Sequence, residues 1–572
     1  MKLEPKYYVL DELLERRLFR IPEYQRAYSW EKKQREDLFD DIIKILEYPP
    51  DRHHFMATVV CLNTNKKEEI GADEFTTVNI VDGQQRLTTL IILLKAISKQ
   101  LDTKNQTEKD LKKRLNELLV KGDKRLILLQ TNHDSYRIFT DYLKDGTIPE
   151  RNKIQTQADL NLFMAFTECE AFVKTWVEKG RSLIDLLRIL KNRLGFIFYV
   201  LDDEGSVYTV FEVLNSRGLE VDWLDKSKSM LMGLAFEKFK GKAASEHHQE
   251  LHKIWGSIYR LLGTKKILGE EILRFAATLK LYSEPSKTLS SEDAFNFFRS
   301  YCIANPIRIL EVGKWLYDVA NQITLLYSNS RLSAVTDIAH ARLLAIAILQ
   351  TNTLTNEIRE DILNHWERIT FKIFGLYRKD ARTSVGEYVR TAYKIYKKQL
   401  SAKKIISEFK KISEAYPINQ AIQEMKKSDR YEGWENDLRY FLYRYEEYLC
   451  KKQKGNISNE MWEQIWSKSA STTIEHIYPQ SPSKDWVGKL GRGRNQLEKN
   501  VNRIGNLILL PPDINSEAGQ KPFAEKKKIY KNNFLRMHAE VIKCRDWNKA
   551  QIDKREKVLL DWAREAWHDK SS

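Results

Sequence analysis

Apolar positions are spaced differently in residues 1–235 than in the rest of the chain. In this first part, short runs rich in β-branched and aromatic residues predict buried strands, and runs with helical spacing lie between them. The predicted strands are 55–62, 78–81 and 194–201, and the predicted helices are 87–98 and 111–119. Residues 63–74 are polar, and we expect them to form a surface loop. The pattern therefore predicts a mixed α/β domain.

Residues 236–455 contain no convincing strand pattern and are typical of a series of amphipathic helices. One predicted helix has a strongly aromatic face, made of Trp434, Leu438, Phe441, Leu442, Tyr445 and Leu449. Aromatic side chains can stack on bases, but a stripe at helical spacing more often forms core, and we interpret this one as core. The stretch 385–411 is rich in Lys and Tyr, and it suits a solvated face and a DNA-facing one equally.

The last part of the chain follows a polar linker at 451–459. Residues 472–476 suit a strand with Glu475 and His476 near its end, and residues 501–510 suit a second strand. A Lys-rich segment with helical character, PFAEKKKIYKNNF, comes next. The whole pattern predicts three domains, 1–235, 236–455 and 456–572, of which the first is α/β, the second is all-α and the third has the order strand, loop, strand, helix.

Size and composition agree with this division. The chain has 572 residues, which at ~100–200 residues per domain suits about three domains. Hydrophobic residues make up 42% and charged residues 30%, a balance that excludes a mainly disordered chain. No apolar run approaches the ~18 residues of a membrane span, and the N-terminus lacks the apolar core of a signal peptide. We therefore expect a cytoplasmic protein with no membrane partner.

Charge and cysteine usage narrow the class of partner and site. Lys and Arg number 95 against 79 Asp and Glu, a net charge of +16, and residues 481–531 are locally basic. A positive balance favours a polyanionic partner such as nucleic acid, although many basic proteins bind none. The five cysteines lie far apart and form no CxxC pair, which argues against a disulfide framework and against a thiolate metal site.

Polar residues in the last domain suit phosphodiester hydrolysis. A neutral His476 can take a proton from water as a general base. Glu475 and Asn515 offer oxygen atoms to a hard divalent cation such as Mg²⁺ or Mn²⁺. We expect Asn506 to tie the loop together by side-chain hydrogen bonds and so hold His476 in orientation. Contacts with phosphate oxygens are expected from the DNA-binding candidates Lys521, Lys526 and Lys527.

The arrangement EHIxPQ, then GNLxLL, then Asn, Phe and Lys, resembles the HNH nuclease domain of GmrSD-type restriction enzymes. The resemblance covers residues 455–570 and implies a ββα-metal fold. It implies His476 and Asn506 as catalytic residues, and Glu475 and Asn515 as metal ligands. The step from Asn506 to Asn515 also resembles the step between the motif Asn and the metal-binding Asn of other HNH nucleases.

Three polar clusters lie in the first domain, in IPEYQRAYSW, VNIVDGQQRLTT and FEVLNSRGLEVDWLDKSK. Asp82 and Gly83 follow a predicted strand and precede a predicted helix, where backbone N–H groups can bind an anion. Amides and guanidinium groups from these clusters suit phosphates and base edges. Three such clusters in one domain suggest a single site, but three ordinary turns with surface charges explain the same residues.

The triplet YQRxYxW, DGQQR and FExLNSRG resembles the N-terminal domain of the same GmrSD-type enzymes and of related phosphorothioate-sensing nickases. That domain is similar to the ParB/sulfiredoxin fold, and its relatives bind and hydrolyse nucleoside triphosphates at DGQQR to regulate the nuclease. The chain has no GxxxxGK[ST] motif, so a P-loop is excluded. The nucleotide-binding residues that the resemblance implies are Tyr24, Gln25, Arg26, Asp82, Gly83, Gln84, Gln85, Arg86, Asn215, Arg217 and Lys228.

Together these patterns predict a modification-dependent endonuclease or nickase that cuts double-stranded phage DNA and is regulated by GTP, UTP or ATP. Two alternatives stay open. One is a DNA-binding NTPase regulator with a degenerate HNH domain, and the other is an NTPase whose C-terminal domain only grips DNA. The sequence leaves open the DNA modification, the preferred nucleotide, nicking versus double-strand cutting, and whether the chain forms a homodimer.

Overall fold

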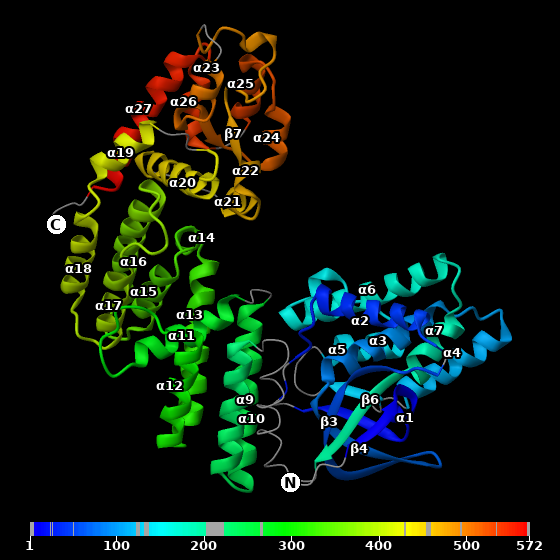
Figure 1. Cartoon of the computed structure of the whole chain (residues 1–572). Coiled ribbons are helices and arrows are strands. Elements are labelled where there is room, and N and C mark those ends of the chain that lie inside the picture. The colour runs from blue at the N-terminus through cyan, green and yellow to red at the C-terminus, as the bar shows by residue number, and fades with distance from the viewer. Residues whose placement is uncertain are drawn as a thin grey trace. The chain divides into compact units, whose positions relative to one another are not determined.

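The computed structural model divides into two compact units, residues 1–277 with 289–321 and residues 278–288 with 322–572 (Figure 1). It describes residues 5–22, 25, 27–49, 51–121, 126–130, 136–201, 222–263, 267–427, 431–453, 459–491, 495–532 and 535–568. The described residues are mostly helical, with one six-stranded mixed sheet near the N-terminus and one two-stranded sheet near the C-terminus. Within these residues, no helix has the length and apolar character to cross a membrane.

The six-stranded sheet has the order β1-β6-β3-β4-β2-β5. Its strands are β1 (Lys6–Val9), β2 (Arg17–Ile21), β3 (His54–Ile70), β4 (Asp73–Asp82), β5 (Leu128–Gln130) and β6 (Leu194–Leu201). The pairs β1/β6 and β3/β4 are antiparallel, and the pairs β3/β6, β2/β4 and β2/β5 are parallel. The three strands that the sequence predicts are confirmed as parts of β3, β4 and β6.

The prediction of a loop at 63–74 is wrong. Strand β3 continues to Ile70, β4 begins at Asp73, and these two residues face each other in the register. Gly71 has φ +66° at the turn, a conformation that glycine adopts without strain. The hairpin end is polar because most of its side chains are exposed, so the backbone pairs there without burying an apolar face.

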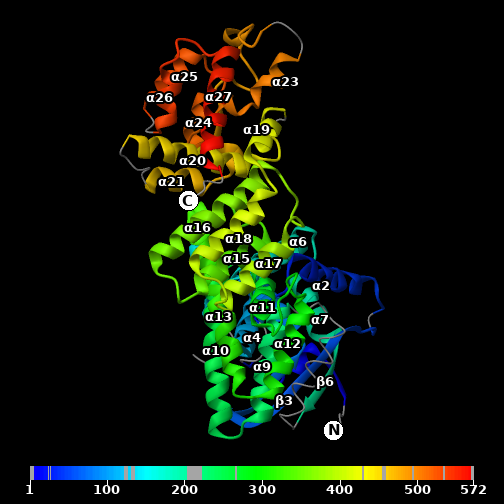
Figure 2. The same cartoon turned by 90° about the vertical axis from the view of Figure 1, so that its left-hand side faces the viewer.

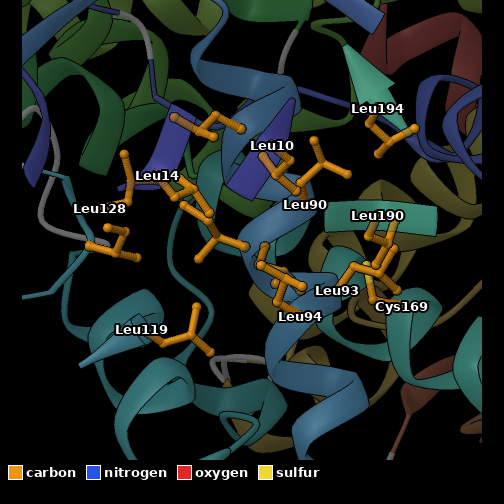
Figure 3. Packing of buried hydrophobic residues seen from close by; sticks show 14 of the residues in the cluster. Leu10, Leu14, Leu90, Leu93, Leu94, Leu119, Leu128, Cys169, Leu190 and Leu194 are labelled. Carbon is orange, nitrogen blue, oxygen red and sulfur yellow. The ribbon is translucent and has the colours of Figure 1, made fainter. Parts of the chain in front are cut away.

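Helix α3 is buried along nearly its whole length, and its apolar residues belong to a large hydrophobic cluster of the first unit. It packs against α4 and α6, and Figure 3 shows Leu90, Leu93 and Leu94 of this helix inside the hydrophobic cluster. The helices of this part are α1 (Leu10–Leu14), α2 (Lys32–Lys44), α3 (Gln84–Gln100), α4 (Gln106–Leu119), α5 (Tyr136–Asp145), α6 (Gln157–Glu178), α7 (Leu183–Asn192), α9 (Trp223–Lys238), α10 (Lys242–Leu262), α11 (Ile267–Lys280), α12 (Ser291–Ala304) and α13 (Arg308–Ser328). The two predicted helices, 87–98 and 111–119, lie within α3 and α4.

The second unit is helical up to its C-terminal part. No strand lies among the described residues of 236–455, as predicted. All six residues of the predicted aromatic face, at and within α20, are buried, which confirms that the stripe is core. The helices here are α14 (Ser330–Ser333), α15 (Ala339–Gln350), α16 (Asn356–Thr370), α17 (Val385–Tyr396), α18 (Ala402–Glu414), α19 (Ile418–Lys427), α20 (Glu435–Lys452) and α21 (Asn459–Trp466), with a π-helical turn at Phe371–Leu376.

The C-terminal part contains a short antiparallel pair, β7 (Ile474–His476) and β8 (Leu507–Leu509). Its helices are α22 (Ala470–Thr473), α23 (Gln496–Val501), α24 (Pro512–Ala518), α25 (Phe523–Lys531), α26 (Arg536–Ile542) and α27 (Lys549–Ala566). Helices α25 and α26 pack side by side (Figure 2). The order strand, loop, strand, helix is confirmed, but both predicted strands are too long. Thr472 and Thr473 belong to α22, Val501 ends α23, and residues 504–506 form a 3₁₀ turn before β8.

Candidate functional site

Strands β7 and β8 place two of the predicted residues at neighbouring positions. Glu475 pairs with Ile508 and His476 pairs with Leu507. Successive side chains of a strand point to opposite faces, so Glu475 and His476 are expected to meet different surroundings. Their contacts differ accordingly: the His476 ring contacts Asn502 and Tyr431, and the Glu475 carboxylate contacts Lys526 and Tyr530.

The His476 ring is held by contacts on two sides. Its Nε2 lies 3.0 Å from Oδ1 of Asn502, and its ring packs edge-on against Tyr431 at 4.6 Å between centroids. An amide oxygen only accepts hydrogen bonds, so this contact requires a proton on Nε2. In the neutral ring the lone pair then lies on Nδ1, which becomes the basic nitrogen.

Asn506 ties together the loop that follows His476. Its Nδ2 donates to the carbonyls of Tyr478 and Val501, at 2.9 and 2.8 Å. Its Oδ1 accepts from the backbone N–H of Tyr478 at 2.8 Å and from Trp547 Nε1 at 3.0 Å. These four hydrogen bonds use the full capacity of a primary amide. The side chain therefore positions the loop, in line with the tying role expected of it, and its amide has no capacity left for a substrate.

Glu475 lies in a buried cluster with two residues of α25. Its Oε1 accepts from Lys526 Nζ and from the Tyr530 hydroxyl, each at 2.7 Å. Lys526 Nζ also donates to the backbone carbonyl of His476 at 2.8 Å. Burial raises the pKa of Glu475, and the Lys526 ammonium opposes that rise. Burial likewise lowers the pKa of Lys526, and the Glu475 carboxylate opposes that fall.

The expected DNA-binding lysines have different surroundings. Lys526 is wholly buried, so the structure disagrees with its expected contact with phosphate and makes it an internal partner of Glu475. Lys527 donates to the carbonyl of Cys544 at 2.8 Å, and Lys521 lies 3.5 Å from Glu517. Both of these side chains are partly exposed, so a phosphate contact from them stays a prediction.

In the first unit, β4 ends at Asp82 and α3 begins at Gln84. Gly83 lies between them with φ +92°, in the left-handed region. A Cβ atom there would come within 3.0 Å of Val59 Cγ2 and 3.1 Å of the Thr58 carbonyl. Backbone conformation and close approach to β3 both require glycine at this turn, which fixes where the N-terminus of α3 begins.

Glutamine side chains join two of the three predicted clusters. Gln84 Nε2 donates to Gln25 Oε1 at 3.0 Å, and Gln25 Nε2 donates to the Val81 carbonyl at 2.7 Å. Gln85 accepts from the backbone N–H of Ser29 at 2.8 Å and donates to the Ala27 carbonyl at 3.2 Å. All three glutamines are buried. Their amides therefore fasten the segment around residue 25 to the start of α3.

Lys228 adds a contact from the third cluster, since its buried Nζ lies 3.3 Å from the Gln25 carbonyl. Arg86 is exposed, with its guanidinium 5.9 Å from the Trp30 ring centroid, and Asp82 is half-buried. The structure thus brings Gln25, the DGQQR turn and Lys228 together. The remaining predicted nucleotide-binding residues, Tyr24, Arg26, Asn215 and Arg217, lie outside the described residues.

Protein-family models match both parts of the chain that contain the candidate sites. The model of the GmrSD restriction endonuclease N-terminal domain matches residues 10–232, and the model of the GmrSD C-terminal domain matches residues 417–562. Together the two matches cover more than half of the chain. The chain belongs to the GmrSD restriction endonuclease family. No curated protein matches it.

The C-terminal domain of this GmrSD chain fits the expected metal only in part. Asn515 Nδ2 donates to the carbonyls of Thr472 and Ile474, at 2.9 and 3.3 Å, and its amide oxygen is a suitable donor for a hard cation. Glu475 does not fit, because a buried ammonium already lies 2.7 Å from its Oε1. Among the described residues, no group of three or more His, Cys, Asp or Glu side chains is placed to hold a metal ion.

Sequence reasoning missed three residues of this GmrSD site. Asn502 contacts His476, Tyr431 packs on its ring, and Tyr530 shares Glu475 with Lys526. Asn502 lies inside the VNRIGNLILL run, four residues before Asn506, which is a signal that could have found it. Tyr431 lies 45 positions before His476, outside the residues 455–570 whose sequence resembles an HNH domain, and no local pattern points to it.

Proposed function

We propose that the C-terminal domain of this chain is a nuclease of HNH type that cuts double-stranded phage DNA, with His476 as the general base. The observation that carries this proposal is the orientation of His476, whose Nε2 faces Asn502 at the end of a strand. Asn506 holds the following loop by four hydrogen bonds, so the imidazole is attached to a fixed backbone. Family membership supports a restriction endonuclease in defence.

In this mechanism, Nδ1 of neutral His476 takes a proton from a water molecule as the water oxygen attacks phosphorus. The bond from phosphorus to the leaving deoxyribose oxygen breaks, and that oxygen takes a proton from a solvent water molecule, while the imidazolium returns its own proton to solvent. Asn502 keeps the proton on Nε2 and stabilises the imidazolium that forms, because its amide oxygen points at that N–H. A divalent cation such as Mg²⁺ or Mn²⁺, with Asn515 as an oxygen donor, supplies charge stabilisation at the phosphate when bound.

The N-terminal domain is proposed to be a ParB/sulfiredoxin-like sensor that binds and hydrolyses GTP, UTP or ATP. The turn from Asp82 to Arg86 supports this, since an exposed guanidinium lies in the first turn of a long helix whose N-terminal N–H groups favour anions. The nucleotide state would bias the cutting domain between two states and so protect host DNA. In the same proposal, the protein acts in the cytoplasm, recognises modified DNA and forms a homodimer.

The test is cleavage of supercoiled plasmids that carry different modifications, with and without each nucleotide and with Mg²⁺ or Mn²⁺. We expect cleavage of at least one modified plasmid, and dependence of that cleavage on a nucleotide. The variant His476→Ala should cut no plasmid and still hydrolyse nucleotide, and the exposed His568→Ala should match the parent in both assays. Nucleotide hydrolysis without cleavage of any plasmid by the parent would favour a regulator with an inactive nuclease domain.

A further inference from the structure

Behind His476 lies a buried charge cluster that the proposed reaction does not use. The side chains of Lys526 and Glu475 are 0% and 5% exposed. Lys526 Nζ lies 2.7 Å from Glu475 Oε1, and the same oxygen accepts from the Tyr530 hydroxyl. A charge so far from solvent is retained only with a partner, so the carboxylate and the ammonium depend on each other.

This cluster conflicts with a metal ion on Glu475. A dication bound to the carboxylate would lie within a few ångströms of the Lys526 ammonium, where like charges repel strongly in a poorly solvated interior. Moving Lys526 away would break its bonds to Glu475 and to the His476 carbonyl. It would also leave a wholly buried side chain without those two partners.

The cluster instead acts on the backbone of His476. Lys526 Nζ donates a hydrogen bond to the His476 backbone carbonyl at 2.8 Å. On the other side, the N–H groups of Ile477 and Tyr478 donate to the backbone and side-chain oxygens of Asn506, at 2.9 and 2.8 Å. The peptide units that follow the histidine are therefore held by α25 through Lys526 and by the loop before β8 through Asn506.

We propose that Glu475 is not a metal ligand, and that Glu475 and Lys526 form a positioning pair that fixes the backbone of the catalytic His476. This inference rests on the proposed nuclease function of the C-terminal domain. Glu475 keeps Lys526 charged and in place, and Tyr530 orients the Glu475 carboxylate by its hydrogen bond. Lys526, held in this way, fixes the position of the His476 carbonyl.

The experiment uses the full chain and four variants. Glu475→Gln and Lys526→Met each remove one charge at nearly constant shape, and a double variant removes both. Lys528→Met is the matched control, since Lys528 lies on the same helix and is exposed. Each protein is measured for Mn²⁺ binding by calorimetric titration, for kcat and KM of plasmid cleavage in Mn²⁺, and for its urea midpoint.

We expect both single variants to bind Mn²⁺ as the parent does. Each should lower kcat by about 100-fold with little change in KM, because displacement of a reacting group by about 1 Å costs that much. Each should also lower the urea midpoint, because one buried charge loses its partner. The double variant should unfold at higher urea than either single variant, since no buried charge is left. Lys528→Met should match the parent throughout.

Several results would overturn the proposal that Glu475 and Lys526 form a positioning pair. Loss of a metal ligand or of its supporting partner costs about 10- to 100-fold in metal affinity, so weakened Mn²⁺ binding by Glu475→Gln would restore Glu475 as a ligand or as the support of one. Unchanged kcat in both single variants would remove the positioning role. A double variant as unstable as the sum of the singles, or one that fails to fold, would show that the charges do not compensate each other.

The nuclease proposal can fail separately. If the parent cuts no plasmid under any condition, the proposed function is wrong. Mn²⁺ binding and the urea midpoints of the same proteins still decide whether Glu475 is a metal ligand and whether its charge is coupled to that of Lys526.

Discussion

Asn502 Oδ1 lies 3.0 Å from Nε2 of His476, and both side chains are buried. This contact selects the tautomer in which Nδ1 is basic. The variant Asn502→Ala should therefore lower kcat for DNA cleavage by about 10- to 100-fold, less than the roughly 10²- to 10⁴-fold loss typical when a general base is removed. Plasmid cleavage under single-turnover conditions measures the effect.

The control for Asn502 is Asn495→Ala, since Asn495 is exposed at the start of α23 and its side chain forms no capping hydrogen bond. It should cleave at the parental rate. Equal rates for Asn502→Ala and the parent would mean that the tautomer is fixed by something other than Asn502.

A second prediction concerns Asn506, whose amide makes four hydrogen bonds inside the domain. Asn506→Ala leaves buried backbone groups and Trp547 Nε1 without partners, at about 1–3 kcal/mol for each unsatisfied group. We expect the C-terminal domain to unfold at clearly lower urea, as followed by tryptophan fluorescence. Asn532→Ala, at an exposed residue, should leave the midpoint unchanged. If Asn506→Ala has the urea midpoint of the parent, the four hydrogen bonds of Asn506 do not stabilise the domain.

A third prediction concerns metal removal. Oxygen donors and the lack of a cysteine cluster favour Mg²⁺ or Mn²⁺ over zinc. EDTA should stop cleavage, and either Mg²⁺ or Mn²⁺ in excess should restore it, whereas Zn²⁺ should not. Asn515→Ala should raise the Mn²⁺ concentration needed for half-maximal cleavage, because the amide oxygen is the proposed donor. Full activity in chelator would remove the metal from the mechanism.

The outcome at individual residues shows what the sequence can predict. Strands β3, β4 and β6 and the aromatic core of α20 follow from apolar spacing, because burial imposes a period on the side chains. The hairpin at 63–74 escapes this logic, since paired strands with two exposed faces carry no apolar period. The partners of His476 and Glu475 also escape it. Lys526 resembles its neighbours in sequence, the half-buried Lys527 and the exposed Lys528, and only the packing of α25 makes it a buried cation.

A fourth prediction concerns pH. Burial among the rings of Phe374 and Tyr388 lowers the pKa of His340 from 6.5 to about 4, with a further contribution from Arg342, while Glu387 and a backbone contact at Thr383 oppose the shift. The unfolded chain therefore binds a proton at higher pH than the folded one. Above pH 6.5 His340 is neutral in both the folded and the unfolded chain, so it does not change the free energy of unfolding. As the pH drops from 6.5 towards 4, the unfolded chain takes up the proton first, and the free energy of unfolding falls by at most about 3 kcal/mol.

The variant His340→Phe keeps an aromatic ring at this place and removes the titration. Its urea midpoint should fall less between pH 7 and pH 5 than that of the parent. The exposed His568→Phe should follow the parent at every pH. If the parent and His340→Phe lose the same stability over this range, another group causes the acid sensitivity.

The last prediction concerns the proposed nucleotide site and its control of the nuclease. Arg86 is exposed beside Trp30 in the first turn of α3, so Arg86→Ala removes a guanidinium from the proposed triphosphate site without opening the core. We expect this variant to fold as the parent does, to lose nucleotide hydrolysis and to fail to protect cells against phage, although His476 and its partners are intact. Asp82→Ala should behave in the same way. The exposed Arg114→Ala on α4 should leave all three measurements unchanged.

A nuclease with an always-available site would damage host DNA, so we expect cutting to depend on the sensor domain. Hydrolysis, cleavage of modified plasmid and phage resistance are measured in parallel for the parent and these variants. Unchanged hydrolysis in both Asp82→Ala and Arg86→Ala would place the nucleotide site elsewhere. Lost hydrolysis with cleavage and resistance intact would show that the two domains work independently. A variant that cuts plasmid without nucleotide would instead show that the nucleotide restrains the nuclease, because loss of binding then releases it.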